Sequence, residues 1–166
     1  RRPPAVQGDA PAAGWAEAVV LIAGIGAPSD VVSVEPATGI SPERVVVRTT
    51  DGAVAAASVT AAGIVVHVQA GAALDEVTLR SYCIGAAHMA FGWVTSEGIA
   101  VDADGTVLDL TIRSLGVLKA SDTPHIQIVV DPSGGEPVQV SDAVFAAVAA
   151  ATWRHLGCPT DWPTGT

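Results

Sequence analysis

The sequence predicts an α+β fold in which a mixed sheet carries two main helices on one face. Two stretches, residues 74–95 and 141–156, have the length of helices and contain no proline. Around them lie short runs of valine, isoleucine and alanine bounded by Gly, Pro and Asp-Gly, as in strands joined by turns. The helices and roughly seven predicted strands follow one another in β-α-β order, which favours helices packed against one side of a sheet.

The first part of the chain predicts a flexible lead followed by strands. Residues 1–14 are interrupted by prolines and glycines, which is typical of an extended, mobile segment. Residues 15–24 are apolar and fit either a helix or a strand. Asp51-Gly52 lies between two apolar runs and predicts the turn of a hairpin. We predict strands at residues 30–34, 44–49, 53–60 and 63–69.

The helix predicted over residues 74–95 carries two glycines. Gly85 and Gly92 are seven residues apart, so they share one face of the helix, with Ser81 one turn before them. Each glycine costs about 0.5–1 kcal/mol relative to alanine inside a helix. We therefore expect another backbone to approach this face closely, from a strand of the domain or from a partner. His88 lies one turn after Gly85 and either faces a cofactor or partner or, as we favour, simply packs.

The remainder of the chain predicts a hairpin, a strand and a last helix. Asp104-Gly105 predicts the turn of a strand pair over residues 99–112, and residues 125–130 form a further strand. The last helix, 141–156, ends before Gly157 and Pro159. Residues 15–157 are thus expected to form a single α+β domain, followed by an irregular tail at 158–166.

Composition excludes several classes of function. Seventeen acidic residues face eight basic ones, giving a net charge of −9, and the basic residues form no stripe. We therefore expect neither nucleic acid nor an anionic membrane surface as a partner. The longest apolar run, residues 143–151, is far short of the ~20 residues that span a bilayer. We expect a cytoplasmic protein.

The cysteines and histidines do not predict a metal site. Cys83 and Cys158 are expected to be free thiols, with a bridge between them as the alternative. None of the four histidines has a second ligand at a spacing typical of zinc sites, so we expect no metal to be bound by this chain's own side chains.

Five elements in order resemble the C-terminal part of the molybdopterin-binding large subunit of molybdenum hydroxylases, the family of xanthine dehydrogenase and aldehyde oxidase. The resemblance covers roughly residues 44–157. It rests on the helix with Gly85 and Gly92, the hairpin at 99–112, the Ser121-Asp-Thr-Pro124 loop with the strand at 125–130, the loop Val138-Gln-Val-Ser-Asp142 and the alanine-rich helix at 143–156.

Two departures from the family limit what the resemblance implies. Family large subunits are several times longer than these 166 residues and bind the pterin with loops from two large domains. The family loop before the last helix reads Lys-x-Val-Gly-Glu, and its glutamate is the base that activates the metal-bound water. Here Asp142 stands in place of that glutamate, and the lysine and glycine are missing. Ser141 and Asp142 also fit a helix start, as an N-cap and a first-turn acid, and we favour that interpretation.

The resemblance implies a split, processed or stand-alone segment of a molybdenum hydroxylase large subunit. Its partners would be a larger molybdopterin-binding chain or other hydroxylase subunits, in a complex that oxidatively hydroxylates N-heterocycles or aldehydes. The chain starts at Arg1 rather than at methionine, which fits a segment with something upstream removed. Asp142 is the catalytic candidate, and the candidate cofactor contacts are Gly85, His88, Gly92 and Ser141.

We expect no cofactor on the isolated chain, since most of the pterin cradle would lie in the larger chain. The alternative is a non-catalytic assembly or binding module derived from the same family. A small domain with only coincidental similarity is the unrelated possibility.

Overall fold

A computed structural model of the chain describes residues 12–25, 30–36, 43–108 and 111–161. The described residues form one five-stranded sheet with strand order β1-β2-β3-β4-β5. Its strands are β1 (Val32–Pro36), β2 (Glu43–Arg48), β3 (Val54–Thr60), β4 (Gly63–Gln69) and β5 (Ile126–Val130). The helices are α1 (Ala12–Ile25), α2 (Glu76–Thr95), the short α3 (Ile112–Leu115) and α4 (Ser141–His155), with a 3-10 turn η1 (Ala120–Asp122).

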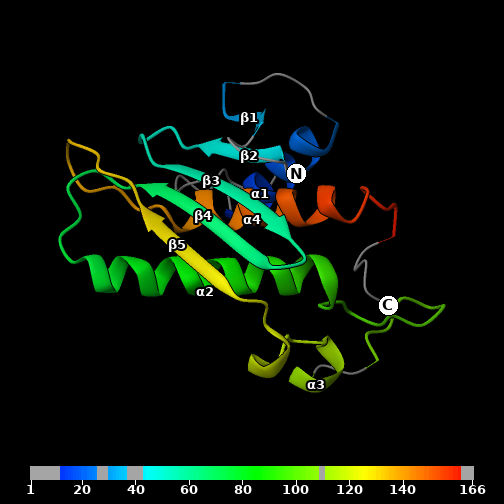
Figure 1. Ribbon diagram of the computed structural model, residues 1–166. Helices are drawn as coiled ribbons and strands as arrows, with labels where there is room; N and C mark the ends of the chain where they lie inside the picture. The colour runs from blue at the N-terminus through cyan, green and yellow to red at the C-terminus, as the bar shows by residue number, and fades with distance from the viewer. Residues whose placement is uncertain (1–11, 26–29, 37–42, 109–110, 162–166) are drawn as a thin grey trace, which may run out of the picture.

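The sheet is mixed because its last strand arrives by a crossover. Strands β1 to β4 pair antiparallel with their neighbours, whereas β5 pairs parallel to β4. Two parallel strands need a long connection, and here α2, α3 and η1 supply it. As a result, the carboxyl ends of β4 and β5 and the first turns of α2 and α4 all lie at one end of the molecule (Figure 1).

The helices α1, α4 and α2 form a layer on one face of the sheet, with α4 in the middle (Figure 1). Helix α4 packs on β2 and β3 and also touches both flanking helices, while α2 continues onto β5. At the edge of the sheet, the Arg80 guanidinium donates to the carbonyl of Ile128 and so joins α2 to β5. The predicted α+β class, with two main helices on one face, is confirmed.

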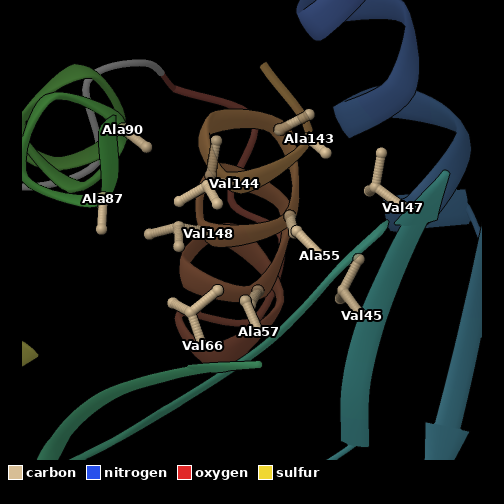
Figure 2. Close-up of a cluster of buried hydrophobic side chains, with 14 of the residues drawn as sticks. Val45, Val47, Ala55, Ala57, Val66, Ala87, Ala90, Ala143, Val144 and Val148 are labelled. Atoms are coloured by element: carbon tan, nitrogen blue, oxygen red, sulfur yellow. The ribbon is translucent and has the colours of Figure 1, made fainter. Parts of the chain in front are cut away.

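The core is built from small side chains. Helix α4 packs against other elements over most of its surface, and only small residues leave room for such close contacts. Every residue of α4 from Ala146 to Thr152 is buried, and the Thr152 hydroxyl donates to the carbonyl of Val148 at 2.7 Å. The alternating inward residues of the strands, Val45 and Val47 on β2 and Ala55 and Ala57 on β3, lie close to this helix (Figure 2). Valine and alanine allow the sheet and three helices to approach one another closely.

Most predicted elements are present. The number of strands is corrected, and one ambiguous segment is resolved. The structure describes five strands rather than about seven, and α1 shows that the ambiguous segment at 15–24 is helical. Strand β4 has the predicted bounds Gly63–Gln69, and α4 begins at Ser141 as predicted. Gly157 follows α4 in the left-handed region, with φ of 83°. None of the helices in the described part of the chain is long and apolar enough to cross a bilayer.

The predicted hairpin over residues 99–112 is confirmed at its turn but not as an extended strand pair. Only one isolated bridge forms there, between Val101 and Val107, and Ile112 begins α3 instead. The turn itself is present because the Asp102 carboxylate accepts the backbone N–H groups of Asp104 and Thr106 at 2.9 and 2.8 Å. The apolar residues alternate as in a strand, but Val101 and Val107 are 51% and 41% exposed. Because these side chains are exposed, no burial of apolar surface stabilises a longer strand pair here.

Candidate functional site

Helix α2 presents the predicted glycine face to the outside. Its start is fixed by Asp75, whose carboxylate accepts the Thr78 backbone N–H at 2.6 Å. This hydrogen bond lowers the pKa of the Asp75 carboxyl. The side of α2 that carries Cys83, Ala87 and Ala90 is buried against the core. The helical repeat therefore places the candidate residues on the opposite side.

The two glycines share that outer face but have different surroundings. Gly92 is buried, and a β-carbon built there would lie 2.6 Å from Oε1 of Glu97 and 3.3 Å from the Leu118 β-carbon. Gly85 is exposed, and no atom would lie within 4 Å of its β-carbon. The expected close approach by another backbone is therefore wrong for both glycines within this chain. At Gly92 the neighbours are side chains, and Gly85 faces open space.

Glu97 is an acid held against α2. Its backbone N–H donates to the carbonyl of Gly92 at 2.9 Å, which continues the helix end and brings its side chain over Gly92. Partial burial raises the pKa of the Glu97 carboxyl, and the nearby charge of His88 opposes this shift. His88 thus lies near an acid of its own chain. Sequence reasoning missed this pair because the turn after α2 brings the two residues together.

The catalytic candidate lies elsewhere. Asp142 is exposed in the first turn of α4, at the end of the molecule where the carboxyl ends of β4 and β5 lie. Gly85 is nine residues into α2, about 13 Å along the helix from its first residue, and on the face turned away from the core. The structure therefore keeps Ser141 and Asp142 together but separates them from Gly85, His88 and Gly92.

Ser141 does not cap α4 as predicted. The helix begins at Ser141, so the capping position is taken by Val140, which has φ of −104° and ψ of −6° and no capping side chain. Asp142 is the first-turn acid that was expected, placed to complement the positive end of the helix. The expected serine cap is wrong because the helix includes Ser141 as its first residue.

A histidine–aspartate pair that the sequence reasoning missed lies on the face of the sheet opposite the described helix layer. The His67 Nδ1 atom lies 3.2 Å from Oδ1 and 3.3 Å from Oδ2 of Asp131, and both side chains are about one-third exposed, at 28% and 35%. The parallel register sets His67 of β4 opposite Val129 of β5, so Asp131 follows on the same face. Such a pair can orient an imidazole ring. No signal within the sequence links these two residues, which are 64 positions apart.

A groove lies beside the carboxyl end of α2. Its volume is about 700 Å³, and Ser96, α3 and the segment from Gly116 to Lys119 line it together with Asp122. Two cations border this groove, Arg113 and Lys119, and neither has a side-chain ion pair or hydrogen bond in the described structure. None of the five predicted site residues lines it.

The described residues do not assemble a metal or thiol site. They contain no group of three or more His, Cys, Asp or Glu side chains that could hold a metal ion. Both cysteines are free, and burial raises the pKa of the Cys83 thiol to about 11. Cys83 therefore stays protonated at neutral pH and acts as a small core residue.

The fold is shared with two oxidoreductases of known structure. It is similar to quinoline 2-oxidoreductase from Pseudomonas putida 86, with a TM-score of 0.50 and 17% identity. It is also similar to reconstituted CO dehydrogenase from Oligotropha carboxidovorans, with a TM-score of 0.53 and 13% identity. Each similarity covers 69% of this chain but only 16% and 15% of the other chain.

A Cu,Mo-CO dehydrogenase in its carbon monoxide reduced state gives a TM-score of 0.48, with 14% identity. No known protein-family pattern and no curated protein sequence matches the chain. At these identities the comparisons establish a common fold. This chain spans about one-sixth of the length of the proteins that share it.

Replacing Gly92 with leucine should destabilise the chain by roughly 1–3 kcal/mol, because the new side chain must displace Glu97 and Leu118. Gly85→Leu is the matched control on the same face, and it should stabilise by about 0.5–1 kcal/mol as a flexible glycine is removed from an open helix position. Urea unfolding of both variants measures these changes. Equal stability of Gly92→Leu and the parent would contradict the packing described for Gly92.

Replacing Glu97 with glutamine should stabilise the chain at neutral pH. A carboxyl whose pKa is raised on folding binds its proton more tightly in the folded state, so ionisation lowers the free energy of unfolding. This loss begins as the pH rises through the ordinary value of 4.5 and is complete above the raised folded-state pKa. The melting temperature of Glu97→Gln should exceed that of the parent at pH 7, and the two should converge below pH 4.5.

Glu136→Gln makes the same substitution at an exposed position and is the control for the effect of the substitution itself. A Glu97→Gln variant that is less stable than the parent at pH 7 would show that the ionised carboxylate is stabilising instead.

Proposed function

We propose that this chain is a segment of the molybdopterin-binding large subunit of a molybdenum hydroxylase, split or processed from it or encoded alone. Two observations support the proposal. Within the sequence, residues 44–157 resemble that subunit's C-terminal part. The fold is similar to that of quinoline 2-oxidoreductase and of CO dehydrogenase. That fold similarity is the observation that carries the proposal.

In this proposal the chain completes a larger enzyme. Its five candidate site residues lie on two separate surfaces, and the described residues offer no cluster able to hold a metal. The residues present therefore do not fit a complete cofactor site. The larger chain would hold the molybdopterin cofactor, which supplies the oxidising chemistry for hydroxylating an N-heterocycle or an aldehyde. A contribution of Gly85, His88, Gly92 and Ser141 to that site remains a prediction, as does a cytoplasmic location.

The second candidate function is a non-catalytic assembly module derived from the same family. The observation that favours it is the position of Asp142, which lies exposed in a helical first turn without the lysine and glycine of the family loop. In such a module the chain would pack against its partner chain and would supply no acid or base for catalysis. The two candidates share the same partner and differ in whether this chain contributes residues to the active site; catalysis by Asp142 would exclude the second candidate.

Purification from the native source tests the proposal. The tagged full chain should carry no stoichiometric molybdenum by itself. A complex that contains it should yield a larger molybdopterin-binding chain by peptide mass spectrometry, and molybdenum by elemental analysis. Stoichiometric molybdenum on the chain alone, or the consistent absence of any molybdopterin-binding chain from the purified material, would overturn the proposal.

The Asp142→Asn variant separates the two candidates within the assembled complex. Because the side chain keeps its shape, the change should cost less than about 1 kcal/mol if Asp142 is only a first-turn acid. We expect activity toward an N-heterocycle or aldehyde to be unchanged. A positioned general base typically contributes 10²–10⁴-fold. A hundredfold loss of activity with unchanged folding would assign catalysis to Asp142 and remove the assembly-module candidate.

A further inference from the structure

Exposed apolar side chains are concentrated in the part of the chain that runs from the start of α2 to just after α3. Of the thirteen large hydrophobic residues that are exposed in the described structure, eleven lie between Leu74 and Val117. On α2 itself, Val77, Tyr82 and Met89 are 78%, 67% and 54% exposed. The outer side of a surface helix is normally polar, so large apolar side chains there are unusual. Exposed apolar surface of this kind points to an interaction site.

The shape of this side also fits a partner. Gly85 leaves the outer face of α2 open to a close approach, with Tyr82 and Met89 along one flank and Ile84 along the other. At the end of the same face, Gly92 is already covered by Glu97 and Leu118. Leu118 and Ser96 also line the groove beside α3, so the groove begins next to the covered end of this face. We refer to the outer face of α2 from Val77 to Met89 together with the groove as the docking surface.

The charges on this surface select the partner. Two cations, Arg113 and Lys119, and one carboxylate, Asp122, line the groove, so its lining is net positive although the chain as a whole carries a net charge of −9. Neither cation forms an ion pair in the described structure. A second copy of this acidic chain is disfavoured by its overall repulsion. An apolar segment that carries carboxylates complements both the apolar face and the two cations.

We propose that the docking surface binds an apolar segment bearing carboxylates that belongs to the larger molybdopterin-binding chain, and this rests on the proposed function. The chain spans 16% and 15% of the proteins with which it shares its fold, so most of such a subunit lies outside it. The occupant crosses α2 at Gly85 and places its carboxylates near Arg113 and Lys119.

Site-specific photo-crosslinking tests the location. A photo-reactive phenylalanine analogue is placed at Tyr82, at Met89 and, as a control on the face of the sheet opposite the helices, at the exposed Gln127. Crosslinks from Tyr82 and Met89, and none from Gln127, should join this chain to a protein identified by mass spectrometry as the molybdopterin-binding chain. Crosslinks to that chain from Gln127 alone would overturn the docking surface while leaving the proposed function intact.

Two further outcomes of the crosslinking experiment would contradict both proposals. Crosslinks that join two copies of this chain, with no molybdopterin-binding chain present, would overturn both the docking surface and the proposed function. A chain that stays monomeric and forms no crosslink at any of the three positions would do the same.

A charge introduced on the docking surface gives an independent readout. Met89→Glu should weaken binding to the purified molybdopterin-binding chain by about tenfold or more, as expected for an apolar residue within an interface core. Leu21→Glu is the matched control, since Leu21 on α1 is 52% exposed compared with 54% for Met89. Its affinity should equal that of the parent. Equal weakening by both substitutions, or none by Met89→Glu, would contradict the assignment.

Discussion

The close contact of α4 with everything around it is the constraint on which the rest of the structure depends. From Ala146 to Thr152 this helix exposes almost nothing, and its neighbours are α1, α2, β2 and β3. The distance between packed helices depends on the side chains at the contact, and alanine allows the closest approach short of glycine. Interiors are packed densely enough that one added methylene is felt. The alanine-rich sequence of α4 therefore determines how the other helices and the sheet are placed.

This arrangement explains why one side of α2 makes no contact with the core. The core needs only the face of α2 that carries residues such as Cys83 and Ala87, and the Trp93 ring packs on Phe145 of α4 with centroids 5.5 Å apart. Folding of this chain therefore does not require Tyr82, Met89 or the open position at Gly85. Their apolar character is accounted for by a second contact outside the domain. Helix α2 thus has two faces: one packs in the core, and we propose that the other binds a partner.

Sequence reasoning worked where local signals decide the structure. Strand β4 is an apolar run that begins at a glycine, and α2 begins at Glu76 directly after its N-cap Asp75, so the sequence predicts both with nearly correct bounds. The strand pair predicted at 99–112 is limited to one bridge beside its turn, because alternating apolar residues do not by themselves provide a layer that buries them. The pairing of His67 with Asp131 requires the β4–β5 register, and the covering of Gly92 by Leu118 requires the whole crossover to fold. For the candidate site, the sequence placed Asp142 correctly in a first turn but could not show that α2 and α4 present separate surfaces.

Native-state hydrogen exchange tests the central role of α4 most directly. If this helix organises the core, its backbone amides from Ala146 to Thr152 should exchange only through global unfolding, together with those of β3 and β4. Amides between residues 98 and 122, where most side chains are exposed, should exchange through smaller openings. Exchange in α4 that is as fast as in residues 98–122, while β3 and β4 remain protected, would contradict the account.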